Sequence, residues 1–172
     1  MNADVKQVSL RPFDPATDRQ RLELWLRRPH VARWWGDGRT ALNEAMQRDP
    51  AFQAVIMAED IPVGFLCWQR PSPGELREAG LTDLPDGVMD IDILIGEQEW
   101  VGRGIGPRAL QVLADRLRGD PQLVYAGLAT SVSNGRAIRA YEKAGFELFR
   151  EFDDPQSGPC RYILMPLRES EC

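Results

Sequence analysis

Hydrophobic and polar positions form two kinds of pattern along this chain, and each pattern predicts a different element. Apolar residues at alternate positions or in short runs predict strands, here at 8–13, 51–58, 63–69, 88–95, 123–128, 146–152 and 161–167. Apolar residues three or four positions apart predict helices, here from Asp14-Pro15 to a break at Pro29, at 40–48, at 107–117 and from Asn134 to Gly145. Strands and helices therefore mix along the whole chain.

The segment 71–87 differs from its neighbours, because Pro and Gly recur through it and no apolar period stands out. Its acidic residues are Glu75, Glu78, Asp83 and Asp86. This composition predicts a long loop, and loops of such length in a compact domain are usually functional or disordered. Two interpretations of its carboxylates stay open: part of a negative pocket for a cationic ligand, or solvated surface.

Three glycines at alternate positions follow the strand 88–95, in the run Gly102-Arg103-Gly104-Ile105-Gly106. Glycine permits tight turns and close approach of a ligand, and a helix N-terminus offers unpaired N–H donors. Together these features predict a cradle for a pyrophosphate, with an ordinary strand-to-helix turn as the alternative. No Lys-Ser/Thr follows as in a Walker loop, and Pro107 departs from the dinucleotide fingerprint while suiting a first helical turn.

Length, composition and charge bound the class of protein. The 172 residues, 43% of them hydrophobic, suffice for one substantial core, so we expect a single domain over 1–172. No apolar run reaches the roughly 18 residues of a membrane span, and Met1–Gln7 has no secretory apolar segment, so we expect a cytoplasmic protein without a membrane partner. A net charge of −5 argues against nucleic acid as a partner and is compatible with a cationic substrate or with ordinary solubility.

Cysteine and histidine are scarce. Cys67, Cys160 and Cys172 have no paired spacing, so neither a disulfide framework nor a zinc site is expected, and Cys67 lies in an apolar run typical of core. His30 is the one histidine, which excludes a histidine-rich metal site, and we expect no metal. Acid and base roles then fall to carboxylates and tyrosine.

Two carboxylates stand on one face of the strand 88–95. Side chains alternate along a strand, so Asp90 and Asp92 share a face with Leu94, next to the glycine run. They could attract an ammonium group, and Asp92, the nearer to the glycines, could take its proton directly or through water; mutual repulsion would raise the pKa of one of the two. The alternative is a solvated edge of polar residues.

The adjacent tryptophans Trp34 and Trp35 would point about 100° apart on a helix. At least one of them is expected in the core, and the other is free to stack on a sugar ring or a cation. Farther along, Asp153-Asp154 occupy a turn region between two predicted strands, where they could face a cationic ligand or water.

The order of these elements, with two motifs, resembles the GNAT family of acyl-CoA N-acyltransferases. One motif is Gly102–Gly106, which is similar to the family's acetyl-CoA pyrophosphate loop. The other is Asn134-Gly135-Arg136-Ala137-Ile138-Arg139-Ala140-Tyr141-Glu142-Lys143-Ala144-Gly145-Phe146, which matches its late helix. The resemblance implies an α+β fold with a central mixed, mostly antiparallel twisted sheet of about seven strands and about four flanking helices. Val101 departs from the family's usual Gln or Arg, but a loop that binds through backbone N–H groups tolerates this.

The resemblance also implies roles for residues. Tyr141 would return a proton to the leaving thiolate, Asp92 would act as base, and a backbone N–H near Leu94 would stabilise the oxyanion; a core tyrosine is the alternative for Tyr141, and capping the alternative for Asn134. Acetyl-CoA is the implied cosubstrate, and its binding residues would be Leu94, Ile95, Val101, Gly102, Arg103, Gly104, Ile105, Gly106, Asn134, Ala137 and Tyr141.

Residues in the N-terminal half indicate which class of molecule accepts the acetyl group. The stretch Pro29–Gly36 and the strand Met89-Asp90-Ile91-Asp92 resemble aminoglycoside 6′-N-acetyltransferases, which implies transfer of an acetyl group to a 6′-amine and hence drug resistance. The substrate residues would be Trp34, Trp35, Asp86, Asp90, Asp92 and Asp154. Ala129 stands where some of those enzymes carry an aspartate, which puts the substrate range in question.

Other functions stay open. A similar Trp-Trp pair occurs in acyltransferases acting on lysine-derived siderophore precursors, and a polyamine or protein N-terminus is a further acceptor. A chain of this pattern could also be a non-catalytic acyl-CoA-binding regulator. We expect a cationic small-molecule amine as partner and either a monomer or a homodimer.

Overall fold

The computed structural model describes residues 4–169, and the chain forms two compact units. The first unit comprises the chain up to Cys67 together with Ile93–Ala109, and the second comprises Trp68–Asp92 together with the chain from Leu110. One domain over 1–172 stays a prediction.

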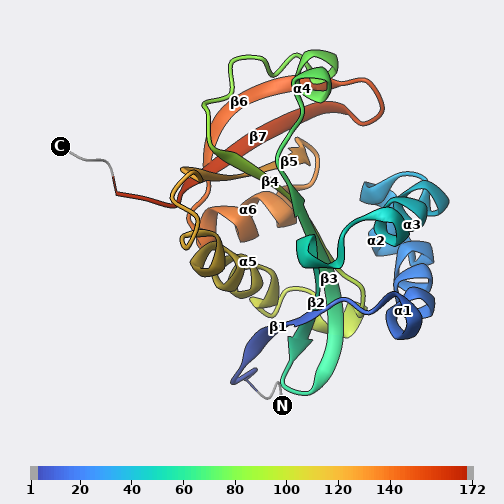
Figure 1. The fold of residues 1–172 in the computed structure, drawn as a ribbon. Coiled ribbons are helices and arrows are strands. Elements are labelled where there is room, and N and C mark those ends of the chain that lie inside the picture. The colour runs from blue at the N-terminus through green and yellow to red at the C-terminus, as the bar shows by residue number, and fades with distance from the viewer. Residues whose placement is uncertain (1–3, 170–172) are drawn as a thin grey trace. The chain divides into compact units, whose positions relative to one another are not determined.

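Seven strands and six α-helices follow one another within the described residues (Figure 1). In chain order they are β1 Val8–Pro12, α1 Pro15–Arg27, α2 Pro29–Trp35, α3 Gly38–Gln47, β2 Gln53–Ala58, β3 Ile61–Gln69, α4 Pro73–Ala79, β4 Val88–Ile95, α5 Ile105–Leu117, β5 Tyr125–Ser131, α6 Gly135–Ala144, β6 Glu147–Asp154 and β7 Gly158–Pro166. Two 3₁₀ turns, η1 Pro50–Phe52 and η2 Gln98–Trp100, complete the list. The predicted alternation of strands and helices is confirmed, with α2 and α4 as short helices beyond the four expected.

The strands form a mixed sheet in the order β1-β2-β3-β4-β5-β7-β6. β4 and β5 pair in parallel, with Asp90 opposite Gly127, whereas β1 with β2, β2 with β3, β5 with β7 and β6 with β7 are antiparallel. The mixed, mostly antiparallel sheet of seven strands is therefore confirmed.

The core of the first unit lies between its helices and strands. Asp14 caps α1 by accepting the N–H of Ala16, and Pro15 occupies the first helical position, where no N–H is needed. The helix then turns Leu22, Trp25 and Leu26 inward, and removal of their apolar surface from water stabilises this packing. The buried cluster consists of Phe13, Leu22, Trp25, Leu26, Val31, Leu42, Ala45, Val55, Phe65, Cys67 and Leu94.

The predicted loop 71–87 is wrong in its first half, because Pro73–Ala79 form α4. Ser72 accepts the N–H of Glu75 while the Glu75 carboxylate accepts the N–H of Ser72, which is a complete capping box. Gly80 ends the helix in the left-handed conformation (φ 68°). Pro73 and Gly80, two of the residues that suggested a loop, are thus the start and stop signals of a short helix. The helix packs through Leu76 and Ala79 on the buried cluster containing Phe152 and Tyr162.

Other boundaries differ by a few residues. The strand expected at 123–128 lies at Tyr125–Ser131, because Asp120 accepts the backbone N–H groups of Gln122 and Leu123 in a turn that delays the strand. The hairpin after β2 turns at Glu59, whose φ is 52°, and β3 already begins at Ile61. Cys67 and Cys160 are buried and form no disulfide within residues 4–169, and Cys172 lies outside the described residues. Among residues 4–169, none of the helices has the length and apolarity that crossing a membrane requires.

Candidate functional site

The glycine loop of the first unit has an open backbone. Gly102 and Gly104 have φ values of 78° and 75°, a region that favours glycine, and a Cβ placed on Gly102, Gly104 or Gly106 would meet nothing within 4 Å. Helix α5 begins at Ile105, so Pro107 lies in its first turn, where the N–H groups have no intrahelical partners. A ligand can therefore approach both the loop backbone and the start of the helix.

The segments on either side of this loop are fixed by contacts that the sequence did not single out. Val101 donates its N–H to the carbonyl of Gln98 at 3.1 Å, and the Arg103 guanidinium lies 4.2 Å from the centre of the Trp100 ring. After the loop, Arg108 donates to the carbonyls of Val5 and Lys6. The Val101 N–H is thus occupied within the protein, whereas the cofactor role of Arg103 and Ile105 stays a prediction.

Leu94 and Ile95, at the end of β4, are predicted cofactor residues, and that role stays a prediction. The side chain of Leu94 is buried in the core of the first unit. The carbonyl oxygen of Leu94 lies so close to Gly64 that a Cβ on Gly64 would overlap it. The Ile95 carbonyl lies 2.9 Å from Nε2 of His30, and since a carbonyl only accepts, Nε2 carries the proton. His30 therefore orients the backbone carbonyl of Ile95.

The tryptophan pair divides as expected on a helix. Trp35 packs on the core of the first unit, with its ring 6.5 Å from that of Phe65. Trp34 is only partly buried, and the guanidinium of Arg33 lies 4.7 Å from its ring centre. Trp34 already binds one cation through its ring face, which is the interaction proposed for a cationic substrate.

In the second unit, Asp90 is hydrogen-bonded to a residue that sequence reasoning missed. Tyr162 of β7 is buried and donates its hydroxyl to Asp90 at 2.8 Å. It reaches across Gly127 of β5, where a Cβ would overlap the hydroxyl. Burial and the negative charges of Asp90 and Asp92 raise the pKa of Tyr162, so it stays a donor. Its signal in the sequence was a lone tyrosine in an apolar strand opposite a glycine-containing one.

Asp92 and Tyr141 act on each other electrostatically. Asp92 is exposed on β4, whereas Tyr141 of α6 is partly buried and packs edge-on against Phe146. Burial, and secondarily the charge of Asp92, raise the pKa of Tyr141 well above its usual range. A phenol that keeps its proton can donate one, and a carboxylate whose charge reaches that phenol can accept one.

Asn134 and Ala137 meet in one hydrogen bond at the start of α6. The Asn134 side chain accepts the Ala137 N–H at 3.3 Å, and Gly145 ends the helix at φ 104°. The capping role of Asn134 is confirmed, and a cofactor contact stays a prediction.

The remaining acidic residues are distributed over the second unit. Asp154 accepts the N–H groups of Gln156 and Ser157 and so shapes the turn between β6 and β7. Glu75 is committed to the capping box, and Asp83 pairs with Arg150. Asp86 is exposed, as is Ala129 on β5, while the substrate roles of Asp86 and Asp154 stay predictions.

A family model described as an acetyltransferase (GNAT) domain matches residues 14–154. The chain belongs to the GNAT acetyltransferase family. This GNAT chain is 30% identical over 151 residues to the aminoglycoside N(6′)-acetyltransferase type 1 of Klebsiella pneumoniae, covering 81% of this chain and 74% of that protein. It also matches a solved structure of AAC(6′)-Ib in complex with paromomycin and acetyl-CoA at a TM-score of 0.79 and 28% identity, covering 94% of each chain. A more distant relative is the N(6)-hydroxylysine O-acetyltransferase of Escherichia coli, 25% identical over 158 residues, which are 87% of this chain and 49% of that protein.

Proposed function

We propose that this GNAT protein transfers the acetyl group of acetyl-CoA to an amine of an aminoglycoside, at the 6′ position. The observation that carries the proposal is the pair of Tyr141, kept protonated by burial, and the exposed carboxylate Asp92, whose charge acts on it. The named activity of the relative from Klebsiella pneumoniae and the acetyl-CoA and aminoglycoside bound to AAC(6′)-Ib support the same reaction.

The transfer proceeds by direct attack, without a covalent enzyme intermediate. The amine nitrogen attacks the thioester carbonyl carbon, a C–N bond forms, and the C–S bond breaks. Asp92 accepts the proton that the amine loses, directly or through water, and Tyr141 donates a proton to the leaving thiolate. The glycine loop would hold the pyrophosphate of acetyl-CoA through backbone N–H groups, and a backbone N–H near Leu94 would stabilise the oxyanion.

Charge and aromatic surface select the acceptor in this proposal. Asp90, Asp86 and Asp154 supply negative charge to a polycationic amine, and Trp34 offers a ring face that already holds a guanidinium. Asp90 is oriented for this role by the hydroxyl of Tyr162. The enzyme would work in the cytoplasm as a monomer or homodimer, on a small-molecule substrate.

The deciding experiment measures thiol release from acetyl-CoA with a panel of amines. The panel holds aminoglycosides that carry a 6′-amine, matched aminoglycosides that carry a 6′-hydroxyl, and lysine and polyamine controls. Turnover confined to 6′-amines supports acceptor and position together. Turnover on 6′-hydroxyl compounds as well shows transfer to another amine of the drug.

The same panel, with N(6)-hydroxylysine added, tests the second candidate, an acyltransferase acting on a lysine derivative. The similarity to the N(6)-hydroxylysine O-acetyltransferase of Escherichia coli favours this candidate, although that protein is about twice the length matched here. Turnover on N(6)-hydroxylysine or lysine and on none of the aminoglycosides would replace the first proposal by the second.

Two variants separate an enzyme from an acyl-CoA-binding regulator. Asp92→Asn and Tyr141→Phe remove the base and the acid, and each should lower kcat roughly 10²-fold while acetyl-CoA affinity changes little. Asp60→Asn, in the exposed hairpin turn, and Tyr125→Phe are the matched controls and should keep wild-type kcat. Full activity in both test variants would show that the catalytic assignment is wrong.

A further inference from the structure

The segment between β4 and the glycine loop is held by side chains that the proposed chemistry does not use. After Ile95, both Gly96 and Glu97 donate their backbone N–H groups to the carbonyl of Val63, at 2.8 and 3.2 Å. The Gly96 carbonyl accepts from Arg28 at 3.0 Å. A Cβ on Gly96 would overlap the indole ring of Trp25, so this peptide lies directly against that ring.

Glu97 is the side chain through which this segment is attached to α1. One carboxylate oxygen accepts the indole N–H of Trp25 at 2.9 Å, and the other accepts from Arg28 at 2.5 Å. Burial raises the pKa of Glu97, but these hydrogen bonds and the charges of Arg28 and Arg21 outweigh burial, so the pKa lies below its ordinary range and the carboxylate is ionised. Hydrogen bonds with an ionised partner are short and strong.

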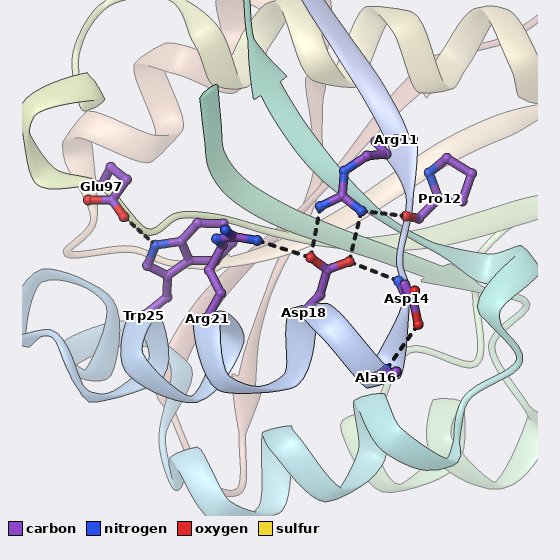
Figure 2. A network of polar contacts seen from close by, with 8 residues as sticks. All are labelled: Arg11, Pro12, Asp14, Ala16, Asp18, Arg21, Trp25 and Glu97. Atoms are coloured by element: carbon purple, nitrogen blue, oxygen red, sulfur yellow. Dashed lines mark hydrogen bonds and ion pairs between the residues drawn. The ribbon is translucent and has the colours of Figure 1, made fainter. Parts of the chain in front are cut away.

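The partners of Glu97 belong to a stripe formed by Asp18, Arg21 and Trp25 of α1 and by Arg28, the residue that follows the helix. Residues three or four positions apart share one side of a helix, and Figure 2 shows Asp18, Arg21 and Trp25 projecting from the same side of α1, with Arg11 at one end and Glu97 at the other. The buried Asp18 accepts two hydrogen bonds from Arg11 of β1, at 2.8 and 2.9 Å. These hydrogen bonds attach the stripe to β1, so the stripe resists moving together with the segment that contains Glu97.

Glu97 is also joined to the glycine loop through the backbone. Its carbonyl accepts the N–H of Trp100 at 2.9 Å, which closes the turn η2. The Trp100 ring in turn contacts the guanidinium of Arg103, inside the loop. Glycine-rich backbone loses much conformational freedom when it is ordered, so a loop that is already held loses less on binding a ligand.

We propose that Glu97 is a positioning residue: with Trp25 and Arg28 it fixes the backbone leading into Gly102–Gly106 and thereby sets the affinity of that loop for acetyl-CoA. This inference rests on the proposed function. Glu97 touches neither the acceptor nor the reacting atoms in this scheme, so its loss should change cofactor binding and not the transfer step.

The test compares Glu97→Ala with Glu99→Ala, since Glu99 has the same charge, lies in the same turn and is exposed. For Glu97→Ala we expect acetyl-CoA to bind about tenfold more weakly, in both KM and a direct calorimetric Kd, because the two hydrogen bonds of the carboxylate are lost and binding must then order the backbone before the loop. The kcat at saturating acetyl-CoA and the KM for the acceptor should stay within about twofold, and Glu99→Ala should match wild type. Arg28→Ala should give a similar loss, and the double variant should add little to either.

Unchanged acetyl-CoA affinity in Glu97→Ala would overturn the proposal, as would a loss of kcat with KM unchanged, which is the signature of a merely structural role. Glu97→Gln keeps an acceptor for the Trp25 N–H and should recover part of the affinity. The calorimetric Kd does not depend on turnover, so the proposal can stand where the acceptor assignment fails. If wild type binds no acetyl-CoA, the proposed function and this inference both fail.

Discussion

At the scale of single residues, the hydroxyl of Tyr162 illustrates how one buried donor orients a site. It donates to Asp90 at 2.8 Å, and Tyr162 belongs to a buried apolar cluster that includes Phe152 of β6. Its position depends on Gly127, because only a residue without a side chain leaves room for the phenol ring. A glycine in the interior of a strand, otherwise unfavourable, thus marks close packing.

Gly127→Ala tests this dependence. The added methyl group would overlap the Tyr162 hydroxyl and approach Val88 Cγ1 to 2.8 Å, so Tyr162 must move and the free energy of unfolding should fall by about 1–3 kcal/mol. Denaturant unfolding measures the change. Gly74→Ala, whose methyl group would meet only atoms at 3.9 Å or beyond, is the control and should unfold near the wild-type midpoint. Equal midpoints for the two variants would contradict the packing argument.

Asp18 makes stability depend on pH. Burial raises its pKa, but the hydrogen bonds from Arg11 and the Asp14 N–H and the charges of Arg11 and Arg21 outweigh burial, so the pKa in the folded state lies below its ordinary 3.8. A carboxylate with a lowered pKa stabilises the fold above the unfolded-state pKa and loses that contribution as pH falls through the folded-state value.

Asp18→Asn should therefore lower the free energy of unfolding by about 2 kcal/mol at neutral pH. The loss is smaller than that caused by breaking a fully buried ion pair, because Arg11 is partly exposed and can turn toward water. The difference from wild type should shrink as pH falls below about 4. Urea unfolding at several pH values measures both effects. Asp115→Asn, in an exposed pair with Arg118, should change stability little at any pH. A difference for Asp18→Asn that does not vary with pH would show that shape, not charge, explains it.

At the scale of elements, α4 shows why composition alone misled. Pro73 and Gly80 looked like loop residues, yet Pro is favoured in a first helical turn and Gly after a last one. The pattern Ser72-x-x-Glu75 was the available signal for a capping box. The helix also depends on neighbours far along the chain, since Arg150 pairs with Asp83 and donates to the Gly80 carbonyl at its end.

Ser72→Ala should loosen α4 without unfolding the protein. Loss of the cap costs about 1 kcal/mol, a large share of the stability of a helix of seven residues. Hydrogen exchange of the amides of Leu76 and Gly80 should accelerate several-fold, while β7 amides keep their protection. Thr82→Ala, exposed just after the helix, serves as the control. Unchanged exchange in Ser72→Ala would mean that tertiary contacts alone stabilise α4.

At the scale of the whole molecule, the net charge of −5 bears on the acceptor rather than on the fold. A negative protein attracts a polycation over distances comparable to the Debye length, and salt screens this attraction. The kcat/KM for an aminoglycoside should fall several-fold between about 0.05 M and 0.5 M salt. The kcat/KM for acetyl-CoA, an anion, measured at saturating aminoglycoside, should not fall in parallel. Parallel falls would show that salt acts on the enzyme in general.

The sequence alone determined the features that depend on neighbours a few positions apart. The limits of β4, the left-handed glycines of the loop and the capped helix from Asn134 to Gly145 all follow from local backbone sterics and from hydrogen bonds that span three or four residues. Such interactions join residues that are close in the sequence, so the pattern of residues predicts them.

Only the tertiary structure decided which distant residues meet. Tyr162 reaches Asp90 because β5 lies between β4 and β7 and presents Gly127 at the crossing, and Glu97 reaches Trp25 because the end of β4 packs on α1. The two residues of each pair are 72 positions apart in the sequence. Their contact depends on strand order and on which neighbouring side chains leave room. Periodicity along a chain reports which face of an element is buried, whereas the partner on that face is chosen by packing, which is a property of the assembled core.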